Sequence, residues 1–134
     1  MHVNELAKLM GVSPDTVRYY TRIGLLSPDK NPANGYKCYG EKQRKRLRFI
    51  TDARSLGFSV EDIRQILDVA DSGKTPCPIA RNLIEVRLQE LEDRFQNMAR
   101  LRQRMLDAVS TWQTKPDMEP DGHAICHLIE EFAK

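Results

Sequence analysis

The feature that most constrains this chain is a heptad repeat that runs through residues 77–112. Apolar side chains recur alternately four and three positions apart, and mostly charged residues fill the positions between them. The first row consists of Cys77, Ile84, Leu91, Met98, Met105 and Trp112, and the second row includes Leu88, Phe95 and Val109. This pattern predicts a helix roughly 50 Å long with an apolar seam. The remaining residues are too few to cover such a seam, so it favours a homodimer over a buried helix in a monomeric bundle.

Charge is unevenly distributed along the chain. Residues 1–58 contain 11 Lys and Arg against 5 Asp and Glu, a balance of +6, whereas residues 59–134 contain 10 against 14, a balance of −4. A basic first part followed by an acidic second part predicts a head that binds a polyanion. Three widely spaced cysteines do not form a disulfide framework, and no apolar run reaches membrane-spanning length. We therefore expect a cytoplasmic protein without a signal peptide or membrane partner.

The basic head begins with two short helical patterns. The first covers residues 4–10 and ends at Gly11, and the second runs from Pro14 to about Ile23 behind a serine N-cap. Two helices joined by a tight glycine-containing turn form a helix-turn-helix unit. Tyr20 is expected to pack, while arginines and a tyrosine on the exposed side can contact base edges or phosphates. The candidate DNA-binding residues of this helix are Thr16, Arg18, Tyr19 and Arg22.

An Asn-Gly pair at positions 34 and 35 predicts a β-hairpin after this unit, because both residues tolerate positive φ. Strands at residues 25–27 and 37–39 would form a small wing. Near its turn, the residues expected to contact a DNA backbone are Lys30, Tyr36 and Lys37. Cys38 is expected to be a small, half-buried residue, because no histidine or second cysteine lies near it in the sequence.

Two further helices complete the head. The helix predicted for Glu41–Leu56 combines an apolar stripe with a basic cluster that is a candidate for phosphate contact. The cluster consists of Lys42, Arg44, Lys45, Arg46 and Arg48, and Arg44 and Arg48 are its chosen DNA-binding candidates. Gly57 ends this helix, and Ser59 with Asp62 predicts a capping box for the next one. A polar linker then leads to the heptad helix, with Cys77 expected at its N-cap.

The chain after the heptad helix is a polar loop followed by a short helix predicted over residues 123–132. Two of the three histidines of the chain flank a cysteine there, in the order His123, Cys126, His127. Residues three and four apart share one face of a helix, so these three side chains can converge. Cys77 begins the heptad helix, where unpaired N–H groups and the helix dipole favour thiolate.

Three segments carry a family resemblance: SPDTVRYY (13–20), NGYKCY (34–39) and LRFITDARSLGFSVEDIRQIL (47–67). With the long helix after them, they closely resemble the MerR family of bacterial transcription regulators. The resemblance implies a mainly α fold, with a winged helix-turn-helix head, a long antiparallel dimerisation helix and a short C-terminal helix. By motif match, Arg18, Tyr19, Tyr36 and Lys37 fall on DNA-contacting positions. The corresponding parts are residues 1–72, 76–112 and 113–134.

The resemblance also implies a mode of action. Family members bind double-stranded promoter DNA whose polymerase recognition elements are spaced too far apart. With an effector bound at the end of the coil, they bend and untwist that DNA so that RNA polymerase can use both elements. The expected function is therefore transcription activation through promoter distortion.

The metal-sensing branch of this family is similar in a further respect. Its members for divalent ions carry a cysteine at the start of the dimer helix, where Cys77 stands, and two cysteines in the loop after it. Trp112 stands about where the first of that pair is expected, and Cys126 fits the second. In an antiparallel coil, Cys77 would approach Cys126 of the partner subunit, with His123 or His127 completing the site. These donors predict a divalent metal effector, with Zn²⁺ favoured over Cd²⁺ or Pb²⁺.

Other functions fit fewer of these observations. The same DNA-binding dimer could respond to thiol oxidation of Cys77 and Cys126, or to an organic ligand stacked near Trp112. The metal ligands could instead be a helix cap, a core cysteine and two solvated histidines. An enzyme using Cys126 with a neighbouring histidine lacks a Gly-rich oxyanion loop, so no catalytic residue is predicted. A coiled-coil adaptor without DNA would not need the basic head.

Overall fold

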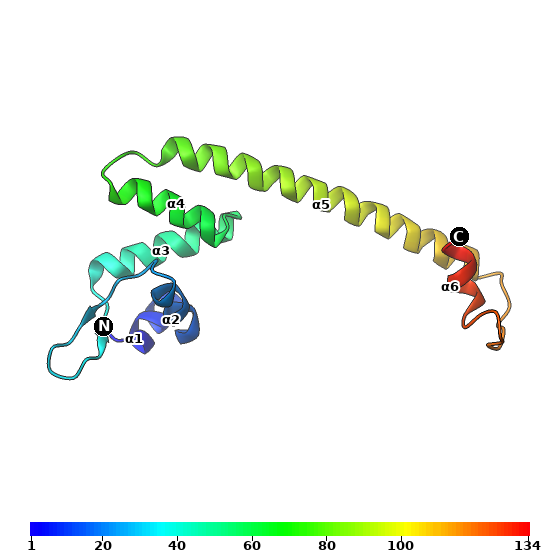
Figure 1. Cartoon of the computed structure of the whole chain (residues 1–134), viewed down its shortest axis with the longest axis horizontal. Coiled ribbons are helices and arrows are strands. Elements are labelled where there is room, and N and C mark those ends of the chain that lie inside the picture. The colour runs from blue at the N-terminus through cyan, green and yellow to red at the C-terminus, as the bar shows by residue number, and fades with distance from the viewer. The chain divides into compact units, whose positions relative to one another are not determined.

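The computed structural model describes residues 1–134 and consists mainly of helices (Figure 1). In chain order, the elements are α1 (Val3–Met10), α2 (Pro14–Arg22), β1 (Asp29–Lys30), β2 (Lys37–Cys38), α3 (Glu41–Leu56), α4 (Val60–Asp71), α5 (Cys77–Trp112) and α6 (His127–Phe132). The chain forms two compact units, residues 1–87 and residues 88–134. None of the helices is both long enough and apolar enough to cross a membrane.

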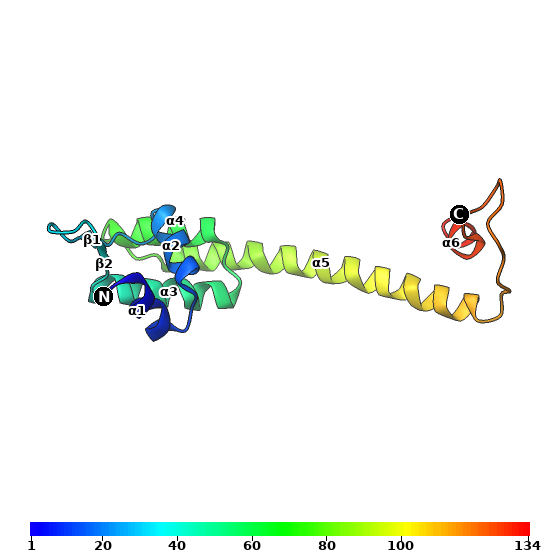
Figure 2. The same cartoon turned by 90° about the horizontal axis from the view of Figure 1, so that it is seen from below.

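The first unit is organised around one hydrophobic core to which α1–α4 and the chain after α2 contribute. Its largest fully buried side chains are Leu6, Val17, Leu25, Leu26, Tyr39, Leu47, Ile50 and Ile63. The hairpin projects from the group of helices in both views (Figures 1 and 2). Apolar residues of the first turns of α5, among them Ile79 and Leu83, also pack against this core. The predicted domain boundary after residue 72 stays a prediction. In the structure, the first compact unit extends to residue 87 and so includes the first turns of α5.

Local signals account for most helix ends of the first unit. Gly11 and Gly57 follow α1 and α3 with φ values of 70° and 109°, a left-handed conformation that costs glycine little. The Ser59 hydroxyl accepts from the Asp62 N–H at 3.0 Å, and the Asp62 carboxylate accepts from the Ser59 N–H at 2.9 Å. The predicted capping box is therefore confirmed, and so are the predicted bounds of α3 and the predicted end of α5 at Trp112.

The first strand of the wing differs from its predicted position. Residues 29–30 pair antiparallel with residues 37–38, in the register Asp29 to Cys38. The predicted strand at 25–27 is wrong, because Leu25 and Leu26 are buried in the core and both of their N–H groups donate to the Tyr20 carbonyl. Cys38 is exposed rather than half-buried.

Arginine side chains fasten the segment after α2 to the later helices of the same unit. Arg46 Nε donates to the Leu25 carbonyl at 2.6 Å, and its two terminal nitrogens contact the Asp71 carboxylate at 2.9 and 3.0 Å. Arg64 donates to the Ile23 carbonyl at 2.6 Å. The inclusion of Arg46 among the phosphate contacts is therefore not supported, because its side chain is only 17% exposed and its guanidinium is hydrogen-bonded to Leu25 and Asp71.

In the second unit, α6 folds back on the C-terminal part of α5. The Phe132 ring lies edge-on to Trp112 at 6.2 Å between ring centroids, and the Arg104 guanidinium lies 5.9 Å from the Phe132 ring. Lys115 forms an ion pair with Glu131 at 3.0 Å, and this hydrogen bond lowers the pKa of the Glu131 carboxyl. These contacts hold the loop and α6 on the end of α5.

The last helix begins at His127, four residues later than predicted. The Asp121 carboxylate accepts from the N–H groups of His123 and Ala124, at 2.6 and 2.8 Å. Such a local turn competes with helix formation. Cys126 is the N-cap residue of α6, so the prediction that His123, Cys126 and His127 share one helical face is wrong.

Candidate nucleic-acid interface

The exposed side of α2 carries the four residues predicted to bind DNA. Arg18 pairs with Asp15 at 2.9 Å, and both side chains are well exposed. An exposed pair of this kind contributes little stability and can exchange for a phosphate. Arg22 lies 5.4 Å from the Tyr19 ring centroid, so these two side chains form one polar surface. The Thr16 hydroxyl is hydrogen-bonded to the Ser13 hydroxyl at 2.9 Å and therefore contributes to the cap of α2.

The packing of the two neighbouring tyrosines follows the prediction. Tyr20 is 8% exposed and belongs to the core, whereas Tyr19 is 39% exposed. The wing residues Lys30, Tyr36 and Lys37 are also exposed. The structure therefore leaves Tyr19 and these wing residues exposed to an external partner.

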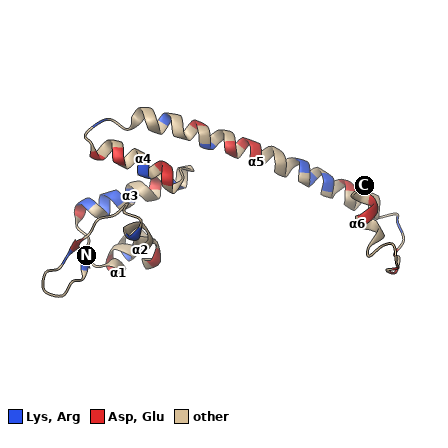
Figure 3. Ribbon diagram, viewed as in Figure 1, with Lys and Arg blue, Asp and Glu red and all other residues tan.

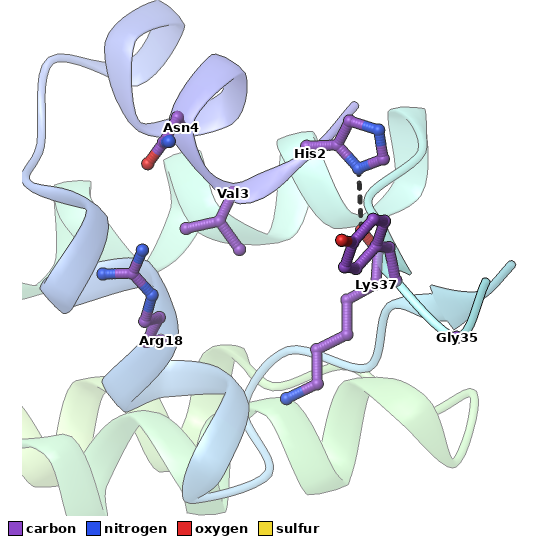
Figure 4. A pocket seen from close by; sticks show the side chains of 7 residues that line it. His2, Val3, Asn4, Arg18, Gly35 and Lys37 are labelled. Atoms are coloured by element: carbon purple, nitrogen blue, oxygen red, sulfur yellow. Dashed lines mark hydrogen bonds between the residues drawn. The ribbon is translucent and has the colours of Figure 1, made fainter.

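A cleft of about 550 Å³ brings the two predicted DNA-contacting regions together. It lies between the start of α1, α2 and the wing, as Figure 4 shows. Its lining residues are His2, Val3, Asn4, Arg18, Gly35, Tyr36 and Lys37. Arg18, Tyr36 and Lys37 were expected from the sequence, whereas His2 and Asn4 were not. Polar residues at the start of the first helix of a basic head were the available signal, but only the fold places them beside the wing.

Contacts between the start of the chain and the second strand hold one wall of this cleft. The Tyr39 N–H donates to the Met1 carbonyl at 2.6 Å, and the buried Tyr39 hydroxyl is hydrogen-bonded to Thr21 at 2.7 Å. His2 Nδ1 lies 3.4 Å from the Lys37 carbonyl, and its ring stands edge-on to Tyr36 at 6.2 Å. The imidazole is therefore positioned by the wing.

The basic side of α3 is the third candidate surface (Figure 3). Arg48 is exposed. Arg44 is hydrogen-bonded to the Glu41 carboxylate, with 2.8 Å between Nε and Oε2, and this contact lowers the pKa of Glu41. Because both groups lie at the surface, the pair leaves Arg44 accessible to phosphate.

The four predicted metal ligands occupy both units. Cys77 is exposed, is the first residue of α5 rather than its N-cap, and donates its N–H to the Thr75 hydroxyl at 3.3 Å. Cys126 is half-buried, and its N–H donates to the Glu130 carboxylate at 3.0 Å. His127 Nε2 lies 2.8 Å from the Pro116 carbonyl and Nδ1 lies 3.5 Å from Glu131, whereas His123 is exposed. No group of three or more His, Cys, Asp or Glu side chains converges on a metal position within the chain.

Comparison with known protein families shows which family the chain belongs to. A model described as "MerR HTH family regulatory protein" matches residues 1–69, and one described as "MerR, DNA binding" matches residues 44–108. The chain belongs to the MerR family. It is accordingly a DNA-binding transcription regulator and not an enzyme.

Relatives of this MerR protein cover most of its length. The HTH-type transcriptional regulator ZntR of Escherichia coli (strain K12) is 39% identical over 110 residues, which cover 79% of this chain and 78% of that protein. The mercuric resistance operon regulatory protein of Serratia marcescens is 32% identical over 127 residues, which cover 95% of this chain and 83% of that protein. The crystal structure of PbrR691 from Ralstonia metallidurans CH34, in complex with lead(II), has the same fold, with a TM-score of 0.77, 21% identity and 98% coverage of both chains.

Proposed function

We propose that this protein is a homodimeric, metal-responsive activator that binds promoter DNA and distorts it for RNA polymerase. The observation that carries the proposal is the exposed surface on which α2 and the wing present Arg18, Tyr36 and Lys37 beside one cleft, in a chain of the MerR family. We propose the DNA-binding residues predicted from the sequence as the contacts to the duplex, except that Thr16 acts mainly through the cap of α2. The proposed location is the cytoplasm, where promoter DNA is accessible.

The dimer is supported by the exposure of the heptad seam. In the single chain, Leu91, Phe95 and Met98 are 57%, 64% and 74% exposed. A continuous apolar surface of this kind marks an interaction site, and the heptad spacing suits another helix of the same type. We propose that α5 of a second protomer covers this seam in antiparallel orientation.

The DNA-binding assignment can be tested with duplexes selected by the wild-type protein from a random-sequence pool. Arg18→Ala should weaken binding by about 1–3 kcal/mol if Arg18 contacts a base edge. Lys37→Ala should weaken binding to selected and unrelated duplexes alike and reduce the salt dependence. Lys74→Ala is the matched control, because Lys74 is an exposed lysine in the linker between α4 and α5. Wild-type affinity in Arg18→Ala would contradict the assignment.

The proposed effector is a divalent metal ion held between protomers. Two thiols and an imidazole are donor types that fit Zn²⁺, with Cd²⁺ or Pb²⁺ as thiophilic alternatives. Since one chain does not gather three donors, we propose that Cys77 and Cys126 of the partner subunit form the core of the site. The residues of the loop and α6 would then be fixed against the start of the partner's α5, and this contact would change the angle between the heads.

The structure distinguishes the two histidines proposed as further ligands. Both ring nitrogens of His127 already face acceptors, the Pro116 carbonyl and the Glu131 carboxylate. Metal binding there would require breaking the contact that holds the loop on α6. His123 is exposed, and its N–H rather than its ring contacts Asp121. We therefore favour His123 as the nitrogen ligand.

Metal stoichiometry of anaerobically purified protein tests this part of the proposal. We expect about one Zn²⁺ per protomer for the wild type and strongly reduced binding for Cys77→Ser and Cys126→Ser. Cys38→Ser, at the exposed cysteine of the wing, is the control and should bind metal normally. His123→Ala should weaken binding more than His127→Ala. Normal binding by both cysteine variants, or no binding of Zn²⁺, Cd²⁺ or Pb²⁺ by the wild type, would favour thiol oxidation or an organic ligand near Trp112 instead.

A further inference from the structure

The cleft between α1, α2 and the wing contains two polar side chains that the proposed interface does not use. His2 and Asn4 stand at the start of α1, and the His2 ring lies next to Lys37 of the wing (Figure 4). Both residues are exposed. The surrounding cationic groups are Arg18 and Lys37, so the cleft combines two positive charges with two further polar side chains.

The cleft also has an apolar part. Val3, which packs in part on the core, and the exposed ring of Tyr36 contribute to its lining. A DNA backbone presents an anionic phosphate next to an apolar deoxyribose ring. The combination of basic groups, polar groups and apolar wall matches this repeating unit, and a phosphate contact fixes the position of a protein on the duplex without reading its sequence.

We propose that this cleft receives one phosphate and the adjoining sugar of the DNA backbone, with His2 and Asn4 as donors to the phosphate beside Arg18 and Lys37. The inference rests on the proposed DNA-binding function and names a further site within that interface. It assigns the start of α1 to phosphate contact, in addition to the contacts from α2 and the wing.

The contact of His2 with the wing determines the protonation state that phosphate binding requires. Because the Lys37 carbonyl only accepts, His2 Nδ1 is the donor in their 3.4 Å contact. A neutral ring with its proton on Nδ1 offers only an acceptor at Nε2, and phosphate oxygens are acceptors too. The doubly protonated imidazole donates from both nitrogens, so it is the form of His2 that can donate to a phosphate while keeping its contact with Lys37.

Charged and titratable groups around His2 come from the neighbouring residue and from three elements. The Met1 amino group donates to the Tyr39 carbonyl at 2.9 Å. Glu5 on α1 accepts from the His2 N–H at 3.4 Å, Arg18 on α2 lines the cleft, and Tyr36, Lys37 and Cys38 belong to the wing. A phosphate adds negative charge beside the two cations and the ring. Because histidine is the side chain that ordinarily titrates between pH 5 and 8, affinity should rise as the pH falls through this interval.

The experiment measures affinity for a wild-type-selected duplex and for an unrelated duplex, at pH 6 and pH 8 and at several salt concentrations. His2→Gln keeps a polar side chain without the ring. Unlike the wild type, it should not bind DNA more tightly at pH 6 than at pH 8. The slope of log affinity against log salt should be steeper for the wild type at pH 6 than at pH 8, by about 0.9 per protomer, and this difference should vanish in His2→Gln. His123 and His127 remain in this variant, so the comparison isolates His2.

Three variants provide the controls. Asn4→Ala should weaken binding to both duplexes by roughly two- to tenfold at either pH, because an amide does not titrate in this interval. His2→Arg carries a permanent charge and should bind at pH 8 at least as tightly as the wild type does at pH 6. Gln65→Arg adds the same charge at an exposed position of α4 that does not line the cleft, and it should have a smaller effect.

The outcomes separate this inference from the proposed function. If His2→Gln keeps the pH dependence of the wild type, or His2→Arg changes affinity no more than Gln65→Arg does, the phosphate site is refuted. Weakening confined to the selected duplex would refute it as well, because a phosphate contact is independent of sequence. If Arg18→Ala still weakens binding in either case, DNA binding through α2 stands. Absence of DNA binding by the wild type would instead refute the proposed function.

Discussion

We expect Arg46 to contribute more to the free energy of unfolding of the first unit than an ion pair with Asp71 alone would contribute. Its Nε donates to the carbonyl of Leu25, a residue only 2% exposed, and the guanidinium also contacts the half-exposed Asp71 carboxylate. A hydrogen bond from a charged donor contributes about 1.5–3 kcal/mol, whereas an exposed ion pair contributes at most about 1 kcal/mol. Arg46→Met keeps helix propensity and side-chain length and should therefore lower the free energy of unfolding by about 2–4 kcal/mol.

Urea unfolding followed by circular dichroism, at equal protomer concentrations, measures this loss. At a typical slope of about 2 kcal/mol per molar urea, Arg46→Met should lower the midpoint by about 1–2 M. Asp71→Asn should cost about 1 kcal/mol or less. Lys45→Met is the matched control, because Lys45 is an exposed neighbour on the same helix, and it should stay within about 0.5 kcal/mol of the wild type. The reasoning is refuted if Asp71→Asn costs as much as Arg46→Met, or if Arg46→Met equals the control.

Three further outcomes are expected. The hydrogen bond from Arg46 lowers the pKa of the Asp71 carboxyl, so this pair should stabilise the folded state above about pH 4 and lose that effect as the pH falls through the lowered pKa. In urea unfolding, the free energies of unfolding of the wild type and Asp71→Asn should therefore become equal at acid pH. Leu47→Ala, at a fully buried position of α3, should lower the free energy of unfolding by about 2–5 kcal/mol in the same assay. Phe95→Glu should convert dimers to monomers in sedimentation, and a monomeric wild type at micromolar concentration would contradict the proposed dimer.

The parts of the fold that sequence reasoning predicted depend on short-range rules. The end of α3 follows from Gly57, and the start of α4 from a capping box whose partners are three residues apart. The length of α5 and its end at Trp112 follow from a repeat sustained along the helix. Each of these signals acts within a few residues, so the sequence displays it directly.

Most of the errors arose where contacts between distant residues decide the structure. Leu25 and Leu26 have the composition of a strand, but burial in a core built from later helices gives them another role. Arg46 belongs to a basic run, yet its partners lie 21 and 25 residues away, at Leu25 and Asp71. Residues 123–126 contradict the helical prediction for a local reason, because the Asp121 side chain binds the N–H groups that a helix would need.

The same distinction applies to the functional surfaces. A helix-turn-helix pattern displays Arg18 on its own, but the cleft exists only because the Met1 carbonyl binds the Tyr39 N–H and brings the start of α1 to the wing. Its histidine therefore has no recognisable motif in the sequence. The proposed metal site depends on contacts of longer range still, because its two cysteines would come from different protomers. Within one chain, the His127 ring nitrogens contact the Pro116 carbonyl and the Glu131 carboxylate, which favours His123 as the metal ligand. The other proposed ligands come from two protomers, so their arrangement depends on the dimer.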